Sequence, residues 1–334
     1  MKKFIILSLV NLVFMSTVFG QKIRDFVVSD SLVYVLKGQN KISVYNKVTL
    51  KLVEEIQTEG DTQLNNISLK GDELIVVANN KNLLFYQNKE WKIIYSSLNK
   101  VNGVQYTSKG DGYLFTDKGI EDVSTSKIYN QQKTMNTQIR IKEGMSVPST
   151  YFIDRSNVIW GGFNYGEWGG DIIAFDTENK SFIDLNMNEV KVELLPVVNF
   201  FEDREQVYFT SGLEHLMYSG SLIQFKDYTA KEILEVYSKS VFEDNGDDIE
   251  LLGAGDYCGA EEVIYLFAGK NLLKGQLSVD LSKIENWQVL LPKSSKQENE
   301  MVIRLKVLAK NKVIYLTEKG TLTYYNYGVI HKIP

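Results

Sequence analysis

The chain has 334 residues, of which 44% are hydrophobic, and a formal net charge of −5 at pH 7. This length is enough for one large core or for two ordinary domains. Lysines and arginines are scattered among acidic neighbours, so we expect no nucleic-acid partner, because a phosphate backbone requires a clustered basic surface.

The N-terminal segment has the pattern of a secretory signal peptide. A basic start is followed by an apolar run over residues 4–14, and the small residue Gly20 precedes the expected cleavage point. We therefore predict a signal peptide at 1–20 and one mature domain at 21–334, secreted or periplasmic and without a membrane span. An uncleaved membrane anchor is the alternative.

A short β-rich segment with an aromatic or aliphatic centre recurs seven times along the mature chain. The copies lie at residues 32–36, 74–77, 112–115, 158–161, 207–210, 263–266 and 313–316. Their centres are roughly 40 to 57 residues apart, which is the size of a propeller blade. Polar or glycine-containing turns flank each copy, as expected between antiparallel strands.

The sequence thus predicts an all-β fold, a seven-bladed β-propeller of four-stranded antiparallel blades. In the first unit the strands are expected at 23–28, 32–36, 41–45 and 50–56, and the last unit is expected to end at Ile333. No strand would be exchanged between the termini, so ring closure would depend on apolar packing. Two tandem β-sandwiches are the alternative, although they would not produce the repeating interval.

The fourth unit carries a family resemblance. Residues 153–161 combine an Asp turn with an apolar-Trp-Gly strand, and residues 169–176 begin with Gly-Gly. This pattern resembles the blade repeat of two-component-regulator-type propellers. In that family such blades form sensor regions, often ahead of a membrane span and a kinase. The chain reaches Pro334 with neither, so we do not expect a signalling role.

Two loops that follow the second strands of the fourth and fifth units are the best candidate site. They cover residues 162–170 and 211–220 and are expected to lie side by side on one face. The candidate ligand-binding residues are Asn164, Tyr165, Glu167, Trp168, His215 and Tyr218. Aromatic faces beside an amide and a carboxylate suit a sugar ring or a peptide. Alternatively, Trp168 packs on the neighbouring blade and Glu167 caps a turn.

Metal and cofactor signatures are weak. His215 and His331 are the only histidines and lie in different units, so no zinc spacing exists, and we predict no metal and no cofactor. The acidic segment 243–250 has the composition of a calcium loop without the EF-hand spacing. The single cysteine, Cys258, is expected to be an apolar filler.

The leading hypothesis is an exported binding or scaffold propeller whose ligand is a protein, peptide or glycan. The alternative is a carbohydrate-active propeller hydrolase or lyase that uses Glu167 or Asp171 with His215 or a tyrosine. Two carboxylates about 5–10 Å apart that face the central channel would favour the enzyme. The sequence leaves the oligomeric state open.

Overall fold

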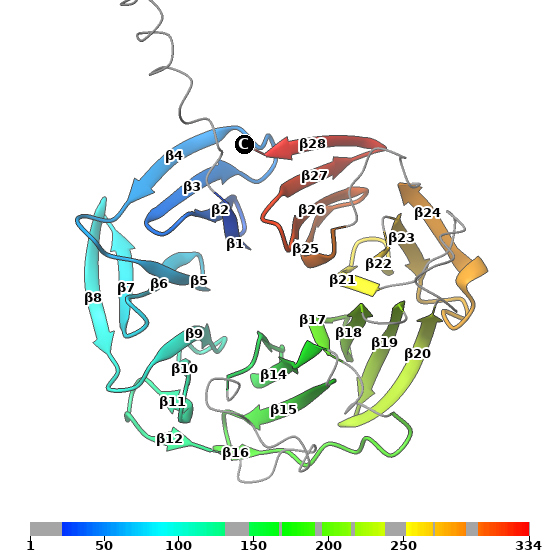
Figure 1. The fold of residues 1–334 in the computed structure, drawn as a ribbon, viewed down its shortest axis with the longest axis horizontal. Helices are drawn as coiled ribbons and strands as arrows, with labels where there is room; N and C mark the ends of the chain where they lie inside the picture. The colour runs from blue at the N-terminus through cyan, green and yellow to red at the C-terminus, as the bar shows by residue number, and fades with distance from the viewer. Residues whose placement is uncertain are drawn as a thin grey trace, which may run out of the picture.

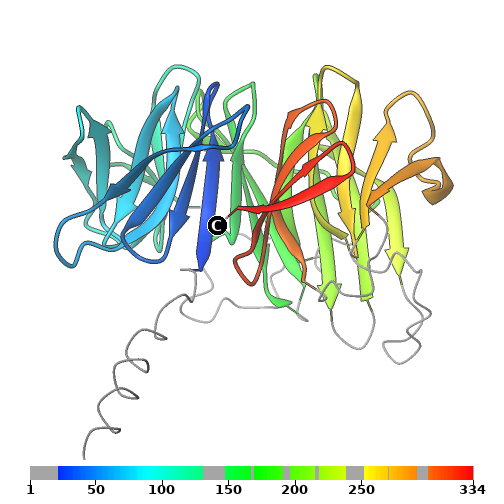
Figure 2. The same cartoon turned by 90° about the horizontal axis from the view of Figure 1, so that it is seen from above.

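The computed structural model describes residues 22–130, 147–166, 169–190, 196–214, 218–237, 252–269, 271–291 and 300–333. Within them, seven four-stranded antiparallel sheets are arranged around a ring (Figure 1). The predicted seven-bladed β-propeller is confirmed. Figure 2 shows the ring from the side, with the strands running between its two faces.

The blades share one strand order, from the ring axis outward. The inner strands are β1 (Ile23–Val28), β5 (Leu64–Lys70), β9 (Val101–Tyr106), β13 (Thr150–Ile153), β17 (Val197–Glu202), β21 (Leu252–Cys258) and β25 (Val302–Ala309). The second strands are β2 (Leu32–Lys37), β6 (Glu73–Ala78), β10 (Gly112–Thr116), β14 (Val158–Asn164), β18 (Val207–Glu214), β22 (Val263–Ala268) and β26 (Lys312–Thr317). These second strands contain the seven repeated segments.

The outer half of each blade is a further hairpin. The third strands are β3 (Lys41–Asn46), β7 (Asn82–Gln87), β11 (Gly119–Asp122), β15 (Gly170–Asp176), β19 (Tyr218–Lys226), β23 (Asn271–Gln276) and β27 (Leu322–Asn326). The outer strands are β4 (Leu52–Gln57), β8 (Glu90–Ser96), β12 (Ile128–Tyr129), β16 (Ser181–Phe182), β20 (Thr229–Tyr237), β24 (Trp287–Leu291) and β28 (Val329–Ile333). A short 3₁₀ helix, η3 (Ile284–Asn286), precedes β24.

The core is divided into seven apolar clusters, each of which joins two neighbouring blades. The repeated aromatic residue of the second strand supplies the largest buried side chains, including Trp160, Tyr208 and Tyr265. Trp160 of the fourth blade, for example, packs 4.9 Å from Phe225 of the fifth, measured between ring centroids. The aromatic centre of the repeat therefore fills the wedge between sheets.

Asp154 shows why the fourth blade has the Asp–Trp pattern noted in the sequence. Its carboxylate accepts hydrogen bonds from the Val158 backbone N–H at 2.9 Å and from the Trp160 indole N–H at 2.8 Å. Burial raises the pKa of Asp154, against these hydrogen bonds. The pattern thus closes the turn between β13 and β14 and orients the buried tryptophan.

Ring closure involves no exchanged strand among the described sheets, because each sheet consists of four consecutive strands. Ile23 and Phe26 of the first blade pack with Leu316 and Tyr324 of the last, which confirms the predicted apolar closure. An ion pair between Asp25 of the first blade and Arg304 of the last also joins these blades, and the sequence analysis did not predict it. No helix in the described part of the chain is long and apolar enough to span a membrane.

Candidate binding site in the central channel

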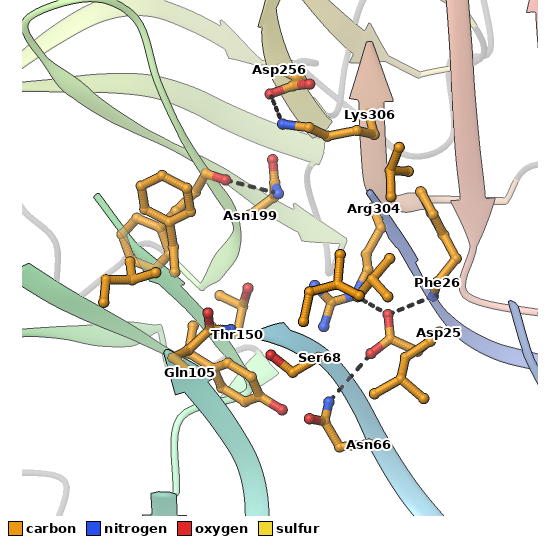
Figure 3. A pocket seen from close by; sticks show the side chains of 18 of the residues that line it. Asp25, Phe26, Asn66, Ser68, Gln105, Thr150, Asn199, Asp256, Arg304 and Lys306 are labelled. Atoms are coloured by element: carbon orange, nitrogen blue, oxygen red, sulfur yellow. Dashed lines mark hydrogen bonds and ion pairs between the residues drawn. The ribbon is translucent and has the colours of Figure 1, made fainter. Parts of the chain in front are cut away.

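The inner strands enclose a cavity of about 300 Å³ on the ring axis (Figure 3). All seven inner strands contribute to its wall, so that the site is a product of the complete ring. The polar and charged side chains of the wall are Asp25, Asn66, Ser68, Gln105, Tyr106, Thr150, Tyr151, Asn199, Asp256, Arg304 and Lys306.

A β-bulge near the start of the inner strand positions several of these residues. Six inner strands lose regular pairing with the second strand at this place, and β13 alone keeps a regular register. Asp25, Asn66, Asn199 and Arg304 each resume the pairing directly after the irregularity. Bulges bend a strand and redirect its side chains, which explains polar groups on the channel wall within otherwise apolar strands.

Gly103 occupies the corresponding place on β9. A side chain there would overlap the phenol of Tyr151, which lies directly against this glycine. The Tyr151 hydroxyl donates a hydrogen bond to the Asn102 carbonyl at 3.3 Å. The third and fourth blades are therefore joined across the channel wall by a half-buried phenol.

The first ion pair of the channel joins the last blade to the first. Arg304 Nε lies 2.7 Å from Asp25 Oδ1, which also accepts the Phe26 backbone N–H at 2.8 Å. The other oxygen, Oδ2, accepts a hydrogen bond from Asn66 Nδ2 at 3.4 Å. Burial raises the pKa of Asp25, and the charge of Arg304 opposes this rise.

A second ion pair joins the sixth and seventh blades. Lys306 Nζ lies 3.1 Å from Asp256 Oδ1, and Asp256 Oδ2 accepts the Val307 backbone N–H at 2.8 Å. On the neighbouring wall, Asn199 Oδ1 accepts the Gly255 backbone N–H at 3.1 Å. Polar side chains thus bond to the inner edge of the adjacent blade at several points of the ring.

Two buried polar atoms of the wall have no hydrogen-bond partner in the described structure. They are the side-chain carbonyl oxygen of Asn66 and the hydroxyl of Tyr106. Burial also raises the pKa of Tyr106 to about 12, so this phenol is protonated at neutral pH. Unpaired buried polar groups are uncommon in folded proteins.

The loop residues predicted from the sequence do not line this cavity where they are described. Asn164 is exposed, and its side-chain oxygen accepts the Gly166 N–H at 2.8 Å. Tyr165 is only 8% exposed and packs near Phe163, with ring centroids 5.9 Å apart. Burial raises the pKa of Tyr165.

The remaining loop candidates lie outside what the structure describes. This applies to Glu167, Trp168 and His215, to the side chain of Tyr218, and to the acidic segment 243–250. A ligand-binding role of these loops stays a prediction. The sequence analysis did not predict the polar channel residues. Four otherwise apolar inner strands have a charged or amide residue at their third position, and this pattern could have indicated a polar channel wall.

The catalytic candidate Asp171, the single cysteine and the histidine of the last blade all have structural contacts. Asp171 is 1% exposed and accepts the Ile172 N–H at 2.8 Å. Cys258 is a buried free cysteine, and burial raises the pKa of its thiol. His331 stacks on Tyr324 at a centroid distance of 6.4 Å on the outer edge of the last blade. No cluster of metal-binding side chains occurs among the described residues.

The channel wall therefore combines amide side chains with acidic and basic side chains that pair with one another. The two carboxylates that face the cavity, Asp25 and Asp256, are each held by a cation of the same strand, β25, and by a backbone N–H. A general acid–base pair requires groups that can exchange protons with a substrate. The channel offers hydrogen-bond donors and acceptors from all seven inner strands around one cavity.

Comparisons with known proteins define the fold class. No family model and no curated protein matches the sequence, so the two-component-regulator resemblance remains a prediction. The structure is similar to that of YCF48 bound to D1 peptide, with a TM-score of 0.60, 12% identity and coverage of 92% of each chain. It is also similar to Hsv2 of Kluyvelomyces marxianus, with a TM-score of 0.57, 10% identity and coverage of 91% and 92%.

A computationally designed protein, Ika8, is a further structural neighbour, with a TM-score of 0.55, 10% identity and coverage of 95% of this chain and 87% of that one. At these identities the likeness concerns the fold. The protein is thus a seven-bladed β-propeller.

Proposed function

We propose that the protein is an exported binding or scaffold propeller that takes a peptide segment of a partner protein at its central channel. The observation that carries this proposal is the composite wall, in which seven strands present amides, hydroxyls and charges around one cavity. Its acids are already paired with Arg304 and Lys306, which supports binding over hydrolysis.

A peptide is favoured over a glycan by the chemistry of the wall. Each inner strand is the channel-side edge of its sheet, and the backbone groups that no side chain of the wall engages can pair with an extended chain. The YCF48 neighbour is itself bound to a peptide. A glycan would instead be expected to stack on exposed aromatic residues, such as those sought in the loop around Trp168.

Export is proposed from the signal-like pattern of residues 1–20. The test is expression with an epitope tag at the C-terminus, followed by fractionation and N-terminal sequencing. A mature chain that begins at Gln21 outside the cytoplasm supports export, whereas a full-length cytoplasmic chain contradicts it.

Binding is tested with the mature protein, residues 21–334. A peptide display screen and a glycan array are run beside a panel of chromogenic hydrolase substrates. We expect peptide hits that compete with one another and no turnover. Turnover of any glycoside, or hits only on the glycan array, would contradict the proposal.

A further inference from the structure

Strand β25 brings two cationic side chains to the same cavity. Arg304 and Lys306 are separated by one residue, and alternate residues of a strand lie on one face at a spacing of roughly 7 Å. Both line the channel together with the acids that they contact (Figure 3). Whether the channel can bind a further charged group therefore depends on how many hydrogen-bonding atoms of these acids and cations are already used.

The two acids have no unused oxygen. Asp25 accepts donors on Oδ1 from Arg304 and Phe26 and on Oδ2 from Asn66. Asp256 accepts Lys306 on Oδ1 and the Val307 N–H on Oδ2. Each carboxylate oxygen thus already has at least one donor from the protein.

The two cations are less fully engaged. A guanidinium carries five N–H donors and an ammonium carries three. In the described part of the chain, the Arg304 contact to a carboxylate is through Nε, and Lys306 contacts one oxygen of Asp256. The side chains of Arg304 and Lys306 are 32% and 51% exposed, and both line the cavity.

The guanidinium also acts across the channel. Burial raises the pKa of Tyr151 on β13, and the charge of Arg304 opposes this rise. The blade that contains β13 lies across the ring from β25 (Figure 1). The charge of Asp25, the partner of Arg304, acts on the same phenol in the opposite direction, so both members of the ion pair influence the far wall.

We propose that the channel recognises a carboxylate of the bound peptide, held by the free donors of Arg304 and Lys306. This inference rests on the proposed peptide-binding function and specifies the group that is recognised. An arginine fork matches the two oxygens of a carboxylate, and charge-assisted hydrogen bonds are about twice as strong as neutral ones. The carboxylate is that of a peptide C-terminus or of an acidic side chain.

The test uses three fluorescent peptides of equal length that differ only at the C-terminus and at one internal position. The first has a free C-terminal carboxylate and an internal glutamine. The second has an amidated C-terminus and a glutamate at the internal position, and the third has an amidated C-terminus and a glutamine there. Anisotropy titrations of the mature protein should show at least one acidic peptide binding about tenfold more tightly than the neutral one. The peptide that does so identifies the source of the carboxylate.

Matched lysine variants locate the effect. Lys306→Gln should weaken the acidic peptide by about threefold to tenfold and leave the neutral peptide unchanged. Lys310→Gln is the control, because Lys310 also faces a carboxylate, Glu261 at 3.7 Å, yet does not line the cavity. Equal binding of the three peptides, or an equal loss in both variants, would overturn the inference.

The outcome also separates this inference from the proposed function. If display selects a peptide whose affinity survives both removal of its carboxylates and Lys306→Gln, peptide binding stands and carboxylate recognition is wrong. If neither the three probes nor display returns a binding peptide, both proposals fail.

Discussion

The Asp25–Arg304 pair allows a specific test of how the ring is held closed. Arg304→Gln removes the cation and leaves Asp25 with the Phe26 N–H and the Asn66 amide. The side chain of Asp25 is 10% exposed, so water replaces the lost partner poorly. A buried charge without its counter-ion is strongly destabilising.

The expected loss of stability differs between the two substitutions, because Asp25 is more deeply buried than Arg304. Removing one partner of a buried pair costs about 3–5 kcal/mol, and the two remaining donors to Asp25 reduce this to about 2–4 kcal/mol. Asp25→Asn instead leaves Arg304 without its carboxylate partner, but the Arg304 side chain is 32% exposed and accessible to water. We expect that substitution to cost about 1–2 kcal/mol.

The assay is urea denaturation of the two single variants and of the double variant. If the pair acts as a unit, the double variant should lose less stability than the two single losses added together, by about 1–2 kcal/mol. Lys109→Gln is the control, because its ion pair with Glu178 is exposed on both sides. It should leave the denaturation midpoint unchanged.

The pH dependence gives an independent check. Burial raises the pKa of Asp25, and loss of Arg304 should raise this pKa further. A carboxyl whose pKa is higher in the folded state contributes stability below its unfolded pKa and loses it as the pH rises through the folded pKa. The penalty of Arg304→Gln should therefore be largest at neutral pH and should shrink on acidification. Additive single losses, or a pH-independent penalty, would refute this account of closure.

Three further predictions concern other parts of the chain. Hydrogen bonds from Lys274 and Tyr265 lower the pKa of Glu261 although burial opposes them, so Glu261→Gln should destabilise the protein above pH 4.5 and progressively less below it, as measured by thermal melts across pH. Trp168→Ala should weaken binding of a selected ligand by about 1 kcal/mol or more with an unchanged melting temperature; a stability loss of about 3–5 kcal/mol would indicate a packing role instead. Deletion of residues 321–334 removes β27 and β28, which close the ring against the first blade, and should abolish the cooperative melt; a melt like that of the full chain would contradict this.

The blade architecture was predictable because one physical requirement repeats. Each second strand is covered by sheets on both sides, so it is a short apolar run, and its aromatic centre fills the wedge to the next blade. Trp160, Tyr208 and Tyr265 therefore recur at blade-sized intervals that a single sequence reveals. The polar turns before them follow from the same hairpin geometry.

Tyr165 illustrates how residue type alone leaves the position of a side chain open. The glycine-rich segment around it reads as an adaptable binding loop, yet the Tyr165 side chain is buried with Phe163. The two residues are separated by one position at the end of β14, and alternate strand residues share a face. Continuing the strand pattern by two residues would have placed Tyr165 in the core.

The channel wall was harder to predict because it depends on register. Asp25 and Arg304 stand nearly 280 residues apart in the sequence, and only ring closure brings them together. A bulge before each of them shifts the alternation by one residue, so a strict period of two assigns these side chains to the wrong face. The site could not be predicted from a single sequence, because it depends on contacts between residues far apart in the chain and on β-bulges that change the side-chain alternation.

The same ring closure connects stability to binding. Arg304 contacts Asp25 through Nε at the junction of the first and last blades, and its side chain also lines the cavity. A carboxylate bound there would add a second anionic partner to a charge that already closes the ring. Ligand binding should then stabilise the fold by mass action, because the site exists only when all seven inner strands are assembled. If the channel takes a peptide as proposed, a wall that is already assembled lowers the cost of binding.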